Sequence, residues 1–107
     1  MTQKDIYDYL SANPLGVAVH VGDLEDLHGN DYIFLDFLSD DLIGFDNGGI
    51  YKTEIQITVV TKDFENRKVL TQYVKDKFNV SVSYETSDEF LYFLARCRTE
   101  AILYEMV

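Results

Sequence analysis

The clearest pattern in the chain is an alternation of apolar and polar side chains between positions 51 and 59. The residues at odd positions form one row and are largely apolar, whereas Lys52, Glu54, Gln56 and Thr58 occupy the even positions. Side chains of a β-strand point alternately to its two faces, so this segment is predicted to be a half-buried strand. Shorter alternations at residues 17–21 and 80–84 predict two more strands.

Residues 32–38 have the sequence YIFLDFL, which is apolar at consecutive positions apart from Asp36. A strand of this kind has two faces to bury. We expect helices to cover one face and something else, such as another subunit, to cover the other. Tyr32 and Phe34 share a face of this strand and are our candidate subunit-contact residues.

Two helices are predicted. A short one near the N-terminus has Thr2 as its cap and Asp5 in its first turn, and Asn13 followed by proline ends it. A longer amphipathic helix of about four turns is predicted over residues 64–78, where apolar side chains recur at i, i+4 spacing. Its apolar positions are Leu70, Val74 and Phe78, with Val69 and Tyr73 in a second row.

The region between the strands at 32–38 and 51–59 is predicted to be a long hairpin loop, residues 38–50. It contains Asp46-Asn-Gly-Gly, and asparagine and glycine tolerate the positive φ angles of tight turns. The final segment, residues 90–104, fits a helix or a strand, and its aromatic content favours a strand. The chain is thus predicted to be α+β, in the order α-β-β-β-α-β-β. We expect a mostly antiparallel sheet of about five strands with two helices packed on one face.

Length and composition indicate one domain, residues 1–107. The chain is 47% hydrophobic, which is enough to pack a core, and has no apolar run of about 18 residues that would cross a membrane. Its one cysteine, Cys97, has no partner for an intrachain disulfide and is interpreted as a small buried residue. A reducing cytoplasm suits such a chain.

The net charge of −10 is unevenly distributed. No lysine or arginine occurs between Asp5 and Tyr51, a stretch that holds ten acidic residues. Such a segment repels phosphates, which disfavours ordinary DNA binding and anionic membranes. Three interpretations remain open: a solvated face, a surface for a basic partner, or a wall past which DNA slides without sticking.

No motif for catalysis or for a cofactor is present. Cys97 has no histidine near it in sequence, and His20 has no second ligand at metal spacing. Asp36 and Glu54 could approach each other as nuclease carboxylates do, but Gln56 stands where such sites usually have a lysine. We therefore expect a non-enzymatic protein without a cofactor or metal.

The second half of the chain resembles a family of small tailed-phage proteins. The alternating strand ends in a polar turn, YKTEIQITVVTKD at residues 51–63, and an amphipathic helix follows. Next come a short strand with Tyr84-Glu85 and a last strand with Tyr104-Glu105 near its end. The chain is similar in this order and in length to tail terminator and head-tail joining proteins, often described as minor capsid or tail completion proteins.

The resemblance implies a structural role in virion assembly. Members form a hexameric ring at the head-proximal end of the tail, where the ring stops growth of the tail tube and docks on the head connector. DNA passes through the lumen without specific binding. The implied location is the head-tail junction of the virion, and the host cytoplasm during assembly. By topology the loop 38–50 would be an interaction loop at the lumen or between rings, with these candidate residues: Asp40, Asp41, Leu42, Ile43, Phe45, Asp46 and Asn47.

An alternative function of another class is an acidic DNA mimic that inhibits a host DNA-binding enzyme. A mimic should array its acids along one exposed face at the spacing of phosphates. Here the acids cluster near residues 23–26 and 40–46, and few occur in the long predicted helix. Their placement favours the assembly interpretation.

Overall fold

A computed structural model of the chain describes residues 1–22, 31–42, 50–87 and 92–104. Its element order, α-β-β-β-α-β-β, and its α+β class confirm the prediction. The elements are α1 (Gln3–Ser11), β1 (Ala18–Val21), β2 (Tyr32–Leu42), β3 (Ile50–Thr61), α2 (Phe64–Lys77), β4 (Ser81–Thr86) and β5 (Phe93–Tyr104).

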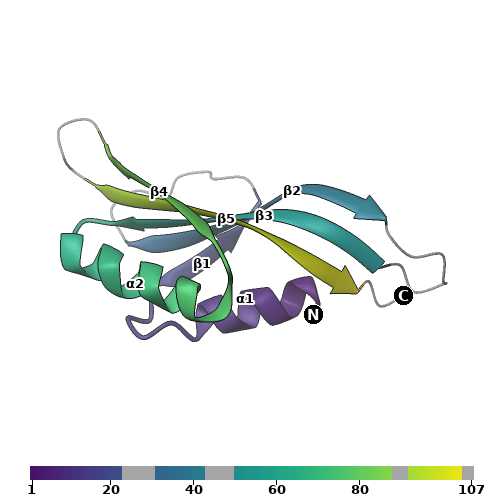
Figure 1. Cartoon of the computed structure of the whole chain (residues 1–107). Coiled ribbons are helices and arrows are strands. Elements are labelled where there is room, and N and C mark those ends of the chain that lie inside the picture. Colours follow the sequence, from purple (N-terminus) through teal and green to yellow (C-terminus); the bar gives the residue numbers. More distant parts are fainter. Residues whose placement is uncertain (23–30, 43–49, 88–91, 105–107) are drawn as a thin grey trace.

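The strands form one five-stranded sheet in the spatial order β1-β2-β3-β5-β4. β1 runs parallel to β2, and every other neighbouring pair is antiparallel. Both helices lie against the same face of the sheet, as predicted (Figure 1). The ambiguous C-terminal segment is the strand β5, also as predicted.

The core lies between the helices and this face of the sheet. Cross-strand partners share a face, and one row across the sheet is Leu35–Ile57–Cys97, all fully buried. Burying a large aliphatic side chain contributes about 1.5–3 kcal/mol each, so these rows account for much of the stability. The helices contribute the buried side chains Ile6 and Leu10 from α1 and Leu70 and Val74 from α2.

The helix ends follow the sequence signals. Asp5 N donates to Thr2 Oγ1 (3.2 Å) and Thr2 N donates to Asp5 Oδ2 (2.8 Å), which forms a complete capping box at α1. Asn13 fixes the turn after α1, because its Nδ2 donates to the carbonyls of Leu10 and Val17. α2 begins at the cap Asp63.

The predicted loop 38–50 is wrong at its N-terminal end. β2 continues to Leu42, and Asp40, Asp41 and Leu42 pair with Thr53, Lys52 and Tyr51 of β3. The long β3 strand extends the antiparallel ladder over these residues, after a register shift between Phe37 and Ser39. The remaining loop candidates, Ile43, Phe45, Asp46 and Asn47, lie outside the described residues.

One predicted core position of α2 is also wrong. Val69 is 42% exposed, whereas Arg67 and Thr71 are buried. The row Arg67, Thr71, Val74 faces the sheet instead. The guanidinium of Arg67 lies 4.9 Å from the ring centroids of Phe64 and Tyr84, so aromatic side chains enclose this charge.

Candidate functional site

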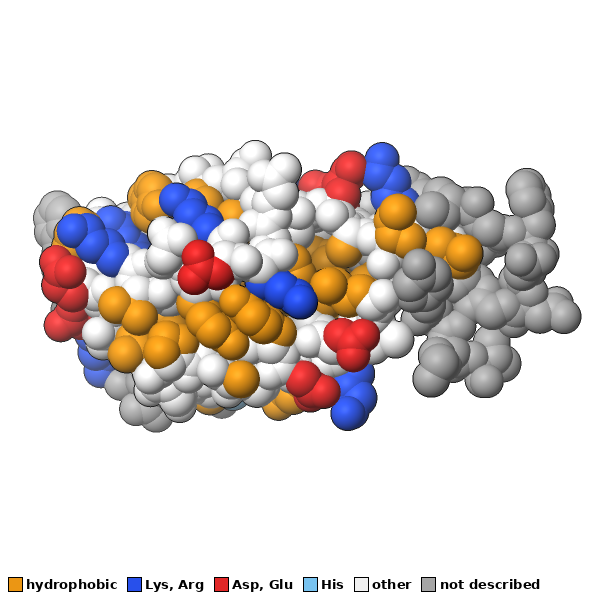
Figure 2. Space-filling view, turned by 60° about the horizontal axis from the view of Figure 1, so that its bottom comes forward, with side chains coloured by type: hydrophobic (Ala, Val, Ile, Leu, Met, Phe, Trp, Pro, Cys, Tyr) orange, Lys and Arg blue, Asp and Glu red, His pale blue; other side chains and the backbone are white. Residues whose placement is uncertain are grey.

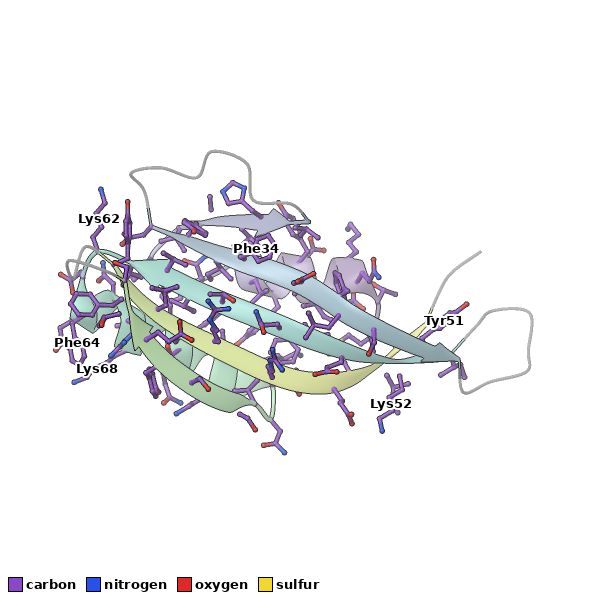
Figure 3. The ribbon with its side chains drawn as sticks, turned by 90° about the horizontal axis from the view of Figure 1, so that it is seen from above. Phe34, Tyr51, Lys52, Lys62, Phe64 and Lys68 are labelled. Carbon is purple, nitrogen blue, oxygen red and sulfur yellow. The ribbon has the colours of Figure 1, made fainter. Side chains whose placement is uncertain are left out.

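The face of the sheet opposite the helices, which we call the open face, is the candidate functional site. Figure 3 looks onto it, with the helices behind the sheet. Because Leu35, Ile57 and Cys97 face the helices, the residues between them in each strand point to the open face. The open face is formed by Tyr32, Phe34 and Asp36 of β2, by Lys52, Glu54, Gln56, Thr58 and Val60 of β3, and by Leu94, Arg96, Arg98, Glu100 and Ile102 of β5.

An apolar row crosses one end of this face. Tyr32 is the cross-strand partner of Val60, and Val60 is the partner of Leu94. Val60 is only 6% exposed, although neither helix lies on this side. The ring of His20 packs edge-on against Tyr32, with 5.9 Å between their centroids. Burial, and to a smaller extent the nearby Tyr92, raise the pKa of Tyr32 above its ordinary value.

The structure brings the two predicted contact residues together. Tyr32 and Phe34 lie two residues apart on the open face, and both are half-buried. Figure 3 labels Phe34 on β2, on the side of β1. Their part in a subunit contact stays a prediction, but their placement makes them available to a partner.

The centre of the open face is polar and internally hydrogen-bonded. Arg98 Nε donates to Gln56 Oε1 (2.9 Å), and Gln56 Nε2 lies 3.5 Å from Thr58 Oγ1. Gln56 and Thr58 are 9% and 7% exposed, so these contacts satisfy groups that water reaches poorly. Sequence reasoning missed this network, because Gln56 and Arg98 are 42 residues apart.

Charges of both signs lie around this centre. Arg96 Nε lies 3.1 Å from Glu85 Oε1, and Lys52 Nζ lies 3.2 Å from Glu100 Oε2. These partly exposed pairs contribute about 0–1 kcal/mol each. Glu54 stands directly opposite Glu100 in the register of β3 and β5. The described acids of the open face are therefore interspersed with bases.

The groups that might carry chemistry are separated. Cys97 is fully buried on the helix side, and burial raises the pKa of its thiol to about 11, which disfavours the nucleophilic thiolate. Asp36 pairs with Gln56 and Glu54 with Ser39, so the two carboxylates are not cross-strand partners. Among the described residues no group of three His, Cys, Asp or Glu side chains could hold a metal ion. Within the same residues, no helix is long and apolar enough to cross a membrane.

Three strands reach past the helices at one end of the molecule (Figure 1). We call this the tip: residues 38–42 of β2, 50–54 of β3 and 100–104 of β5. Figure 3 places Tyr51 and Lys52 at this end and Lys62, Phe64 and Lys68 at the other. Leu38 and Ile102 are 40% and 52% exposed there, so the tip presents apolar side chains to solvent. It includes Asp40, Asp41 and Leu42 of the candidate loop residues.

Comparisons with known proteins give a similarity to a solved structure. No protein-family model matches the sequence, and no curated protein matches it. The structure is similar to a chain in a solved structure described as "Virion of native gene transfer agent (GTA) particle". The TM-score is 0.62 at 14% identity, over 92% of this chain and 91% of that chain. At this identity the similarity shows a shared fold over nearly the whole length.

Proposed function

We propose that this protein is a structural component of a virion, and that it acts as a tail terminator or head-tail joining protein. The observation that carries the proposal is the open face. Its apolar row, Tyr32, Val60 and Leu94, lies on the side without helices. Partly exposed aromatic residues beside a satisfied polar centre are typical of a surface that packs against another protein.

The structural comparison supports the broader part of the proposal, a structural component of a virion. The similar chain belongs to the particle of a gene transfer agent, and the shared fold spans nearly all of both chains. A fold can serve many functions, so the similarity adds to the argument from the open face and does not replace it.

In the proposed assembly, copies of the chain form a ring, which we expect to be a hexamer, at the head-proximal end of the tail tube. Tyr32 and Phe34 contact a neighbouring subunit. The tip and the sequence that follows β2 contact the lumen or the next ring. The residues proposed for this contact are Asp40, Asp41, Leu42, Ile43, Phe45, Asp46 and Asn47. Carboxylates there would let DNA pass without adsorbing, because they repel its phosphates. The ring docks on the head connector.

The DNA-mimic alternative has less support. A mimic needs exposed carboxylates in an uninterrupted array. Glu85 of β4 and Glu100 of β5 are paired with Arg96 and Lys52 instead. This mixed pattern suits a protein contact better than competition with DNA.

The proposal is tested by deleting the gene in the genome that encodes it and examining the particles by electron microscopy. A terminator predicts tails of uncontrolled length, and a joining protein predicts normal tails separated from heads. Complementation with Phe34→Glu should fail, whereas Gln3→Glu, which adds the same charge at an exposed position of α1, should restore intact particles. Normal, infectious particles after deletion would refute the proposal.

A further inference from the structure

One side of β5 has no described neighbouring strand along the tip. β4 begins at Ser81, opposite Arg98, so it pairs with β5 only up to that residue. β3 pairs with the other side of β5 as far as Tyr104. Residues 99–104 therefore have a described strand on one side alone (Figure 3). Figure 2 shows charged and hydrophobic side chains at the surface of this end of the molecule, beyond the helices.

The ladder identifies the backbone groups on the uncovered side. In an antiparallel pair, alternate residues exchange both hydrogen bonds with their partner. Ser87 N donates to Tyr92 O (3.0 Å), so Tyr92 and every second residue after it point their backbone groups toward the β4 side. The N–H and C=O groups of Glu100 and Ile102 thus point to the uncovered side. Among the described residues only Thr99 Oγ1 contacts one of these groups, the carbonyl of Glu100, at 3.4 Å.

A cleft opens on the open face where β4 begins. Thr99 Oγ1 donates to the carbonyl of Asn79 (2.8 Å), which ties the chain before β4 to β5 at this point. The cleft has a volume of about 490 Å³ and is lined by Glu54, Asn79, Ser81, Arg98, Thr99 and Glu100. It leaves room for the side chain of a residue placed beside Glu100.

The tip carries an excess of negative charge. Its three strand segments hold four acidic residues and one basic residue, a net charge of −3. Glu54 stands opposite Glu100 in the register, and the one base, Lys52, lies 3.2 Å from Glu100. Glu54 has no ion pair with a described residue. A basic side chain beside Glu100 would therefore be favoured, and an apolar one would suit Ile102, which is 52% exposed on the same face.

We propose that the β5 edge of the tip binds an extended segment of another protein as an added strand, antiparallel to β5. The bound segment continues the sheet in the position that a longer β4 would occupy, with backbone hydrogen bonds to Glu100 and Ile102. It carries a lysine or arginine next to Glu100 and an apolar residue next to Ile102.

A second copy of the chain offers no described strand of this chemistry. The other described strands with an uncovered edge are β1, β2 beyond Leu35, and β4. None of them contains lysine or arginine. The inference rests on the geometry and charge of the tip and not on the proposed function.

The probe for this site is a synthetic peptide, GTVVTKTG. Paired antiparallel, it places its lysine opposite Glu100 and its second valine opposite Ile102. Binding is measured from the backbone amide shifts of the nitrogen-15-labelled full chain, with peptide up to about 5 mM. We expect the largest shifts at Glu100 and Ile102, with a Kd of about 1 mM. The matched peptide GTVVTETG, which reverses the charge, should bind about fivefold more weakly or worse.

Proline substitutions test the backbone bonds. Ile102→Pro removes an N–H that points to the uncovered side, so the chain should fold and lose about tenfold or more in peptide affinity. Ile102→Val keeps that N–H and is the control, with affinity within about twofold of the unaltered chain. Ala101→Pro removes an N–H that points to β3, so it should destabilise the fold instead.

Other outcomes overturn the inference. These are an absence of shifts, shifts confined to surfaces outside the tip, equal affinity for the two peptides, or unchanged binding by a folded Ile102→Pro chain. If the same amides shift when the chain alone is concentrated, the occupant is a second copy and the inference is wrong. Thermal unfolding shows whether Ile102→Pro folds, and if it does not, the two peptides on the unaltered chain decide. Because the isolated chain is tested, a failure here leaves the proposed function standing.

Discussion

Tyr9 of α1 and Tyr73 of α2 are joined reciprocally. Their rings stack with centroids 4.4 Å apart and planes 7° apart. The hydroxyl of each residue donates to the backbone carbonyl of the other, at 2.7 Å in both cases. Since 64 residues separate the two tyrosines, this pair joins the helices to each other independently of the sheet. It holds α1 and α2 together on one face of the sheet.

The first prediction concerns this pair. Tyr73→Phe keeps the ring but removes the hydroxyl that donates to the carbonyl of Tyr9, which still accepts a hydrogen bond from Ala12 N at 3.2 Å. The free energy of unfolding should fall by about 1 kcal/mol, measured by urea denaturation. Tyr7→Phe, at an exposed position of the same helix α1, is the matched control and should change stability by less than about 0.5 kcal/mol. Equal stability of both variants would show that the reciprocal bonds contribute nothing.

The second prediction concerns the buried charge of Arg67. Its Nη1 donates to the carbonyls of Glu85 and Leu94, both at 3.3 Å, between the rings of Phe64 and Tyr84. Arg67→Ala should destabilise the fold by about 2–4 kcal/mol, through lost hydrogen bonds, lost ring contacts and a cavity. Arg67→Lys should recover part of this loss, since it keeps the positive charge but lacks the planar guanidinium group.

Thermal unfolding measures this difference. Lys68→Ala is the control, because its side chain is exposed next to Arg67 in sequence. If Lys68→Ala destabilised the chain as much as Arg67→Ala, the enclosed guanidinium would have no special role.

The third prediction concerns the facing acids Glu54 and Glu100. Like charges directly opposite in a sheet repel, so Glu54→Gln should stabilise the isolated chain by about 0.2–1 kcal/mol. Glu100→Gln should stabilise it less, because it also removes the ion pair with Lys52. Chemical denaturation at low and high salt measures the unfolding free energy of both variants. The stabilisation should be smaller at high salt, because salt screens the repulsion between the two carboxylates. A destabilised Glu54→Gln variant would contradict this account.

The fourth prediction concerns stability at high pH. The pKa of Cys97 rises from 9.0 in the unfolded reference to about 11 in the fold, mainly through burial. The folded state therefore favours the protonated thiol. This contribution is fully present below pH 9 and is lost as pH rises through about 11.

Unfolding free energies measured between pH 8 and 11 should fall, and Cys97→Ala should make that slope shallower. Burial also raises the pKa of Tyr9 and Tyr32, which leaves a remaining slope. An unchanged slope in Cys97→Ala would be the contrary result.

The sequence pattern could predict which face of a strand is buried better than it could predict where a strand ends. Alternation at residues 51–59 places Ile55 and Ile57 correctly in the core, because strand periodicity is local. The end of β2 was missed, because Asp40 and Asp41 have low strand propensity and the register shift after Phe37 breaks the alternation. Only the ladder with β3 places them in a strand.

The candidate site shows the same limit. Tyr32 and Phe34 were predictable, because residues 32–38 are apolar on both faces of the strand and a helix layer buries only one face. The groove along α2 that Val69 and Tyr84 line was not predictable, because these two residues come from different elements. Val69 follows the helical apolar pattern, and its exposure depends on how α2 rotates against the sheet.

The central claim is that this chain builds part of a virion through its open face. Electron cryomicroscopy of particles produced from the encoding genome tests it most directly. The account predicts a ring of copies at the head-proximal end of the tail, with Tyr32 and Phe34 covered by a neighbouring protein. Particles that lack the chain, or that contain it with both residues facing solvent, would contradict the account.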